Sequence, residues 1–273
     1  MKIIRTISEL KEELKNLNGT IGFVPTMGAL HKGHVSLIEK SKSQNDFTIL
    51  SVFVNPTQFL EGEDLDKYPR NESADTRVAE ICGVDILFLP KADEIYTKIE
   101  PLITAPKEIA SILEGATRPG HFDGVLRVIN KLFNITKPTR AYFGKKDAQQ
   151  LIIIKNMVES FFMNIEIVPC ETVREPDGLA FSSRNSYLNE EDKLNALKIS
   201  RSLLKASNLI KKGELSSKEV IAEMKPILEP LQVDYIAIVD RNFKELQQAE
   251  LKNTIILVAA YVNKTRLIDN IWI

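Results

Sequence analysis

Short apolar runs alternate with segments of helical spacing over the first two thirds of the chain, and this alternation constrains the fold more than any other feature. Residues 20–25 and 47–54 are apolar runs, and residues 34–44 between them can line one helical face with Val35, Leu37 and Ile38. This is a β-α-β unit. It recurs, with helices predicted at residues 73–82, 122–134 and 148–161 and strands at 85–90, 140–144 and 165–169. Such alternation predicts an α/β fold, a parallel sheet covered by helices on both faces.

The pattern changes near residue 175. A turn-rich connector, EPDGLAFSSRNSYL, leads into two charged amphipathic helices predicted at residues 190–212 and 217–228. Three short strands are then predicted at residues 233–239, 255–262 and 266–271. Because 273 residues exceed the usual size of a single core, we predict two domains. Residues 1–174 form the parallel-sheet domain and residues 175–273 form a smaller α+β domain.

The balance of charge and apolar residues restricts the class of partner. With 36 Lys+Arg against 37 Asp+Glu, the chain has no overall positive electrostatic field that would attract polyanions, so we expect no nucleic-acid partner. The longest strongly apolar run, residues 255–262, is far short of the ~20 residues that cross a bilayer, and the charged N-terminal segment does not resemble a signal peptide. We therefore expect a cytoplasmic protein without membrane contact. Cys82 and Cys170 belong to no CxxC pair, and we expect both to be reduced core thiols.

Polar segments follow three of the predicted strands, namely PTMGALHKGH, NPTQF and FGKKDAQQ. Because ligands of parallel sheets bind beyond the carboxyl ends of the strands, we expect these segments to form one site. In the first, Gly33 permits close backbone approach, and the helix start offers unpaired N–H groups to a phosphate. His31 and His34, three residues apart, can donate to the same anion. A zinc site with His121 as a third ligand is the alternative.

Two further segments have the composition of a nucleotide site. In Gly144-Lys145-Lys146-Asp147, a lysine can neutralise a polyphosphate and the aspartate can accept from a ribose hydroxyl, although a solvated helix start would look the same. The stretch from Ser182 to Ser186 combines small polar side chains with Arg184 and could close over phosphates, or could be a loop and a helix cap.

Two glutamines near strand ends could bind a hydroxy acid without adding charge. Gln58 and Gln150 follow predicted strands, where an uncharged amide can pair with hydroxyl and carboxylate groups. Each could equally be a surface residue. All these segments occur together and in this order on one βα scaffold, which favours a site over a set of unrelated surface residues.

Seven blocks of the sequence resemble one enzyme family. They are PTMGALHKGH, FVNPTQF, DLDKYPR, RPGHFDGV, YFGKKDAQQL, TVREPDGLAFSSRNSYL and KTRLIDNI, and they are similar to pantothenate synthetases (pantoate–β-alanine ligases) along essentially the whole chain. The HKGH motif alone marks only the wider nucleotidyltransferase superfamily. The resemblance implies a Rossmann-like N-terminal domain, a smaller C-terminal lid domain, a homodimer, and use of ATP with Mg²⁺, whose protein ligands it leaves unknown.

The resemblance also implies roles for individual residues. His34 would be the proton donor, and Phe181 to Arg184 would be a mobile loop that closes over ATP. Gln58 and Gln150 would bind pantoate, Gln58 would also contact β-alanine, and the main chain of Val173 would contact adenine. The implied catalytic residues are His31, His34, Lys146, Ser182, Ser183 and Arg184. The implied ATP contacts are Met27, Gly28, Ala29, Leu30, His31, Lys32, Gly33, His34, Gly144, Lys145, Lys146, Asp147, Val173, Phe181, Ser182, Ser183 and Arg184.

The implied reaction is the ATP-dependent condensation of (R)-pantoate with β-alanine. It would pass through a pantoyl adenylate and release AMP and diphosphate. Another adenylate-forming or adenylyl-transferring enzyme of the superfamily is the alternative, since it would share His31 and His34 but need not share Gln58, Gln150 or the KTRLIDN block. A catalytically silent nucleotide-binding protein would be expected to have lost a histidine or the lysine, and neither is missing.

Overall fold

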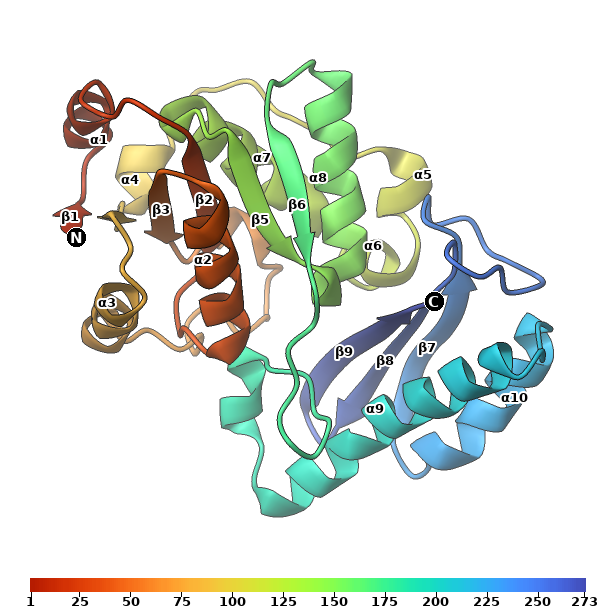
Figure 1. The fold of residues 1–273 in the computed structure, drawn as a ribbon. Helices are drawn as coiled ribbons and strands as arrows, with labels where there is room; N and C mark the ends of the chain where they lie inside the picture. The colour runs from red at the N-terminus through yellow and green to blue at the C-terminus, as the bar shows by residue number, and fades with distance from the viewer. The chain divides into compact units, whose positions relative to one another are not determined.

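A six-stranded parallel sheet organises the N-terminal unit in the computed structural model, which describes residues 1–273 (Figure 1). Its strand order is β1-β4-β3-β2-β5-β6. The chain leaves β2 for β3 on one side and later returns to β5 on the other, so the topological switch point lies between β2 and β5, where ligands of such sheets bind. The strands are β1 Lys2–Ile4, β2 Ile21–Thr26, β3 Phe47–Val52, β4 Ile86–Phe88, β5 Arg140–Gly144 and β6 Glu166–Cys170.

Alternate residues of each strand build two apolar layers, one on each face of the sheet. Val24 and Leu50 pack with α2 and α3 residues such as Ile38 and Ala79, all fully buried. On the other face, Phe23 meets Phe133 of α7 edge to face, with ring centroids 6.3 Å apart. The helices of this unit are α1 Ile7–Leu14, α2 Lys32–Gln44, α3 Glu72–Ile81, α4 Ala92–Ile95, α5 Lys107–Ala110, α6 Leu113–Thr117, α7 His121–Thr136 and α8 Ala148–Ser160, with the short 3-10 turn η1 Pro56–Gln58.

The C-terminal unit packs two helices on a three-stranded antiparallel sheet of order β7-β8-β9. Its core joins Leu203 and Ile210 of α9 and Met224 of α10 to Val258 and Ala260 of the middle strand. A capping box at Asn189 starts α9. The elements are α9 Glu190–Lys211, α10 Ser217–Leu228, β7 Gln232–Val239, β8 Ile255–Val262 and β9 Thr265–Trp272, with the 3-10 turns η2 Lys145–Asp147 and η3 Ser183–Tyr187.

The predicted α/β class with a second α+β part is confirmed. The structure divides the chain into a unit of residues 1–144 and 149–170 and a unit of residues 145–148 and 171–273. A domain boundary at residues 174 and 175 stays a prediction. The prediction of two core thiols is correct for Cys170, which is buried, and wrong for Cys82, which ends α3 half-exposed. Strand β1 was not predicted from the sequence, because its three residues are too short for a recognisable pattern.

Candidate functional site

The turn that follows β2 is held by a buried carboxylate. Gly28 and Ala29 have positive φ angles of 86° and 50°, and the backbone N–H groups of Ala29 and Leu30 donate to the two oxygens of Asp75 at 3.0 and 2.8 Å. Asp75 lies on α3 and is 3% exposed. A Cβ on Gly28 would lie 2.8 Å from Asp75 Oδ2 and 2.9 Å from Val52 Cγ1, so the position requires glycine for both conformation and space.

His31 and His34 form a stacked pair at the start of α2. Their ring centroids are 4.0 Å apart and the rings are inclined by 29°. His31 is the N-cap, and its Nδ1 accepts from the N–H of Gly33 at 3.1 Å, while His34 Nδ1 accepts from the N–H of His31 at 3.3 Å. Because Nδ1 is an acceptor in each ring, each neutral imidazole carries its proton on Nε2. Lys32, the first residue of α2, adds a cation to the positive end of the helix dipole. Two N–H donors and a helix N-terminus thus make an anion site.

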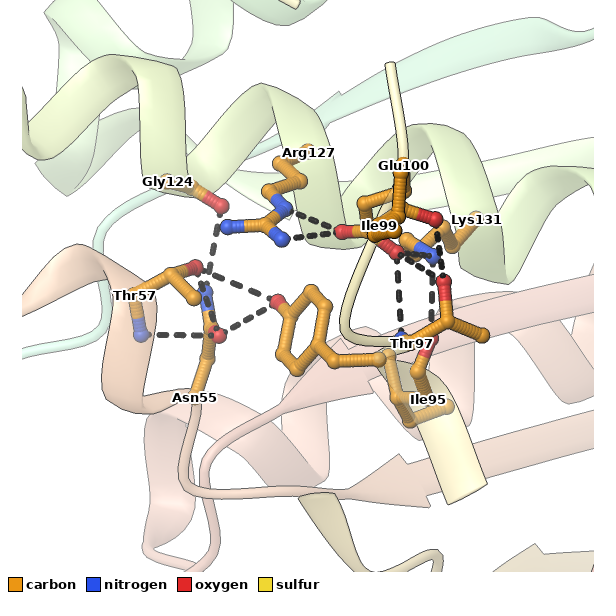
Figure 2. A network of polar contacts seen from close by, with 10 residues as sticks. Asn55, Thr57, Ile95, Thr97, Ile99, Glu100, Gly124, Arg127 and Lys131 are labelled. Atoms are coloured by element: carbon orange, nitrogen blue, oxygen red, sulfur yellow. Dashed lines mark hydrogen bonds and ion pairs between the residues drawn. The ribbon is translucent and has the colours of Figure 1, made fainter. Parts of the chain in front are cut away.

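Gln58 reaches the same loop from η1, after β3. Its Nε2 lies 3.0 Å from the Met27 sulfur, and its Oε1 accepts from Asn55 Nδ2 at 3.0 Å. Asn55 is 1% exposed, and its Oδ1 accepts from the hydroxyls of Thr57 and Tyr96 at 3.0 and 2.6 Å (Figure 2). The structure therefore brings together two of the predicted site residues, Met27 and Gln58, and orients the Gln58 amide through a buried asparagine.

The backbone of Gln58 is fixed by the start of α7. Its carbonyl oxygen accepts from His121 Nδ1 at 2.7 Å and from Arg118 Nη2 at 3.2 Å, and Arg118 forms a two-bond ion pair with Glu63. Burial of the imidazole and, next, the charge of Arg118 lower the pKa of His121 to about 4. His121 is thus neutral at neutral pH, donates from Nδ1 and accepts at Nε2 from Arg118 Nη1 at 3.1 Å. This excludes it as the third ligand of a zinc site with His31 and His34, because both of its nitrogens are used locally.

An ion-pair cluster of Glu100, Lys131 and Arg127 lies beside the hydrogen bonds of Asn55 (Figure 2). Glu100 accepts from Lys131 Nζ at 2.6 Å and from Arg127 Nε at 2.5 Å. The hydrogen bond from Lys131, followed by that from Arg127, lowers the pKa of Glu100 to about 2 against the opposing effect of burial. The Arg127 guanidinium lies 4.6 Å from the ring centroid of Tyr96, whose hydroxyl holds Asn55. The cluster thereby connects helix α7 to the η1 turn that carries Gln58.

Gln150 lies in the first turn of α8 and is half-buried. It makes no hydrogen bond with Gln58 or Met27, so the structure does not join the two predicted pantoate ligands directly. Its neighbour Gln149 is 2% exposed and binds the carbonyl oxygens of Ile109 and Ile112 at 2.7 and 2.9 Å. These bonds fix the start of α8 and, with it, the backbone from which the Gln150 side chain extends.

In the C-terminal unit, the predicted Lys145–Asp147 segment is the 3-10 turn η2, which follows Gly144, the last residue of β5. Lys145 forms an ion pair with Glu171, and its ammonium lies 5.2 Å from the ring centroid of Trp272. Lys146 Nζ lies 3.8 Å from Asp147 Oδ1, a loose pair. Lys145 is therefore engaged within its own unit, whereas the weaker pairing of Lys146 fits a cation that binds a ligand.

The predicted closing segment follows a short hairpin of the same unit. The N–H of Phe181 donates to the carbonyl oxygen of Val173 at 3.1 Å, and Arg174 and Ala180 form an isolated antiparallel bridge. Ser182 then caps η3, its Oγ accepting from the N–H of Arg184 at 3.3 Å. Residues 181–184 are half-buried. The hairpin thus brings Val173 next to Phe181, two residues that are both expected to contact ATP.

Several residues that support the site were not singled out from the sequence. Asp75, Asn55 and Arg118 carry contacts described above, and Asp269 and Asn270 of β9 bind segments of the C-terminal unit. Arg118 lies in the RPGHFDGV block and the β9 pair lies in KTRLIDNI, so the blocks themselves were the available signal. Asp75 lies outside all of these blocks, so no sequence motif identified it.

No group of three or more His, Cys, Asp and Glu side chains in residues 1–273 is arranged to hold a metal ion. None of the helices has both the length and the apolar character needed to cross a membrane.

Comparison with known proteins gives matches over the full length. A sequence model of the pantoate–β-alanine ligase family matches residues 2–272. A pantothenate synthetase from Campylobacter fetus is 66% identical over 273 residues, and one from Helicobacter pylori is 49% identical over 276, each alignment covering 100% of both chains. The crystal structure of the Thermus thermophilus pantothenate synthetase has a TM-score of 0.95 at 39% identity and covers 100% of this chain and 99% of that one. A pantoate–β-alanine ligase from Francisella tularensis, complexed with β-γ ATP and β-alanine, has a TM-score of 0.83 at 39% identity, with 100% and 97% coverage.

Proposed function

The chain belongs to the pantoate–β-alanine ligase family, and on that premise we propose how its residues carry out the family's reaction. It is an ATP-dependent ligase that condenses (R)-pantoate with β-alanine to (R)-pantothenate through a pantoyl adenylate, releasing AMP and diphosphate. The observation that carries this function is the family match across residues 2–272. The roles of individual residues, proposed below, are supported by the geometry of each unit.

In the first half-reaction, a carboxylate oxygen of pantoate attacks the α-phosphorus of ATP. The bond from that phosphorus to the bridging oxygen breaks, and diphosphate leaves. Negative charge grows on the transferring phosphoryl group and on the diphosphate, and preformed N–H donors stabilise it. His31 and His34 supply such donors at Nε2, because their Nδ1 atoms are engaged with backbone N–H groups. His34 takes the role of donor to the leaving group: its Nε2–H forms a hydrogen bond to a diphosphate oxygen, and the proton stays on the ring. Residues 27–34 form the phosphate loop that Asp75 holds in place.

Pantoate lies against Gln58 and Gln150. One N–H of the Gln58 amide is directed to Met27, which leaves the second N–H for a hydroxyl or carboxylate oxygen of the substrate. Because Asn55 fixes the amide orientation, Gln58 binds substrate without first losing side-chain freedom. Gln58 also contacts β-alanine in the second half-reaction.

Residues of the C-terminal unit bind the nucleotide. Lys146 neutralises phosphate charge, and Asp147, which is exposed, accepts from a ribose hydroxyl. The main chain of Val173 contacts adenine, its carbonyl oxygen keeping a second lone pair beside the bond from Phe181. The remaining contacts of this unit come from Lys145, Phe181, Ser182, Ser183 and Arg184, and Gly144 at the end of β5 in the N-terminal unit adds one more.

In the second half-reaction, the neutral amine of β-alanine attacks the acyl carbon of pantoyl adenylate. The bond from that carbon to the phosphate oxygen breaks, AMP leaves, and the nitrogen releases one proton as the amide forms. A free acyl adenylate would hydrolyse, so the site must exclude water while the intermediate exists. We assign this role to the loop of residues 182–186 and to the C-terminal unit as a lid. A desolvated site also favours the uncharged amine over the ammonium.

Mg²⁺ enters with ATP. The chain offers no cluster of carboxylates for a dedicated site, and Mg²⁺ in phosphoryl-transfer enzymes is held largely by substrate phosphates and water. Its charge would offset that of the diphosphate as it leaves. We further propose that the enzyme is a cytoplasmic homodimer.

The test measures the two products separately. With ATP and pantoate alone, diphosphate should appear in one stoichiometric burst, and continuous release of AMP should require β-alanine. His34→Ala should slow the burst by at least the ~10² expected for loss of a transition-state donor. Lys40→Ala, an exposed site on the same helix, is the matched control and should leave the burst unchanged. AMP release at the same rate with and without pantoate would refute the function. A normal burst in His34→Ala would refute the role of that histidine.

A further inference from the structure

Strand β9 carries two adjacent buried polar residues that the reaction described above does not use. Asp269 is 5% exposed and Asn270 is 3% exposed, and both lie in the KTRLIDNI block. In the antiparallel ladder they oppose Val258 and Leu257 of the middle strand, where apolar residues would be expected. Burying a carboxylate and an amide at these positions is unfavourable unless both are fully paired, so their partners indicate what they do.

Asn270 binds the turn that carries Lys146. Its Nδ2 donates to the carbonyl oxygens of Lys145 and Lys146 at 3.0 and 2.6 Å, and its Oδ1 accepts from Trp272 Nε1 at 3.0 Å. An indole N–H can only donate, so this bond fixes which end of the amide is oxygen and directs both amide hydrogens to η2. All of the donors of this side chain are therefore used on one turn.

These two bonds fix the backbone on both sides of Lys146. The carbonyl of Lys145 belongs to the peptide plane before the Lys146 Cα, and the carbonyl of Lys146 belongs to the plane after it. With both planes held, the two backbone dihedrals of Lys146 are set, and so is the direction in which its side chain leaves the turn. A single hydrogen bond would leave one of these planes to rotate.

Asp269 binds the connector in the same way. It pairs with Arg174 through two hydrogen bonds of 2.6 and 3.0 Å, and Arg174 in turn donates to the carbonyl oxygens of Gly178 and Asn270 at 3.1 and 3.2 Å. The N–H of Asn270 donates to Asp269 Oδ1 at 2.8 Å, which couples the two side chains. One strand thus holds both the Lys146 turn and the hairpin that precedes residues 181–184.

We propose that Asn270 is a positioning residue for adenylate formation, which holds the two peptide planes around Lys146 so that its ammonium is aimed at the phosphates of the nucleotide. Asp269 holds the hairpin that precedes residues 181–184 through its ion pair with Arg174. This inference rests on the proposed role of Lys146 in binding ATP. A misplacement of about 1 Å at a reacting group can slow a reaction by ~10², so a residue that never touches the substrate can have a large kinetic effect.

The test is a double-mutant cycle between Asn270→Asp and Lys146→Ala. The aspartate keeps the size of the side chain and an acceptor for Trp272, but it removes both donors to the turn. We expect it to slow the single-turnover diphosphate burst with ATP and pantoate by roughly 10- to 100-fold. In the Lys146→Ala background the same change should slow the burst by less than about twofold, because there is no longer a side chain to aim.

Two further variants keep the test decisive. Trp272→Phe removes the N–H that orients the Asn270 amide and leaves a smaller aromatic ring beside Lys145. It is the substitute if Asn270→Asp fails to fold, and it should show a smaller loss with the same dependence on Lys146. Thr254→Val removes a buried hydrogen bond to the N–H of Glu250 in the same unit and should leave the burst unchanged. Equal losses in both Lys146 backgrounds would show that Asn270 is only structural and overturn the proposal. A normal burst in Lys146→Ala would overturn the role of Lys146 and the inference with it, whereas pantoate-independent AMP release would refute the function itself.

Discussion

His121 couples the stability of the N-terminal unit to pH, and replacing it by glutamine should remove that coupling. The ring is 7% exposed, donates from Nδ1 to the carbonyl oxygen of Gln58 and accepts at Nε2 from Arg118. Protonation would turn the acceptor into a donor facing a guanidinium and would leave two cations in contact. Glutamine has a donor and an acceptor but no titration in this range, so it preserves much of the bonding while removing the pH dependence.

The size of the effect follows from two pKa values. The pKa of His121 is lowered to about 4 in the folded state, against about 6.5 for an unperturbed histidine. As the pH falls below about 6.5, the unfolded chain binds the proton first, so the stabilisation present at higher pH is lost until the folded state also protonates near pH 4. Linkage then gives a loss of about 2 kcal/mol between pH 8 and pH 5, and about 3 kcal/mol by pH 4.

Urea unfolding at a series of pH values from about 8 to 4.5 tests this reasoning. The free energy of unfolding should fall more steeply in the wild-type chain than in His121→Gln, with the two curves converging by about 2 kcal/mol at pH 5. Phe122→Leu is the matched control, since it perturbs the adjacent buried position without changing a titratable group. Its curve should run parallel to that of the wild type. Parallel curves for His121→Gln and the wild type would refute the assigned neutral state of His121.

Four other substitutions test separate parts of the site. Replacing either Gln58 or Gln150 by alanine should weaken pantoate much more than ATP in calorimetric titrations, and equal weakening of both ligands would indicate a general collapse of the site. Asp75→Asn puts an amide N–H against one of the two backbone N–H donors, those of Ala29 and Leu30. It should therefore raise KM for ATP and lower the free energy of unfolding by roughly 1–3 kcal/mol. An unchanged KM would contradict the role of Asp75 in the phosphate loop. The pKa of Glu100 is lowered to about 2 from 4.5, so its stabilising contribution is present above about pH 4.5 and is lost as the pH falls toward 2. Glu100→Gln should therefore reduce the acid-induced loss in the free energy of unfolding by roughly 1–2 kcal/mol, after allowance for solvent screening. An unchanged acid-unfolding profile would contradict the ion-pair assignment.

The sequence alone predicted the strands and helices that carry most of the N-terminal sheet, because hydrophobic periodicity is a local property of the chain. The run at residues 47–54 predicted strand β3, which the structure gives as Phe47–Val52, and the spacing at residues 34–44 predicted α2, observed as Lys32–Gln44. The His31–His34 pair could also be read directly, since both residues lie within one turn of the strand-to-helix junction. Its stacking and the shared use of Nδ1 as acceptor follow from that short separation.

Tertiary structure alone decided what holds these residues in place. Asp75 lies more than forty positions beyond the loop that it binds, and Asn270 reaches η2 across more than a hundred residues. Arg118, just before α7, and His121, its first residue, bind the carbonyl of Gln58 from 60 and 63 positions along the chain. No local spacing encodes such pairs, because they depend on where buried polar groups find partners after the chain has folded. Local periodicity therefore determines where the reactive side chains lie along the chain, whereas hydrogen bonds between distant segments determine their orientation, since a buried donor or acceptor must be paired wherever the fold places it.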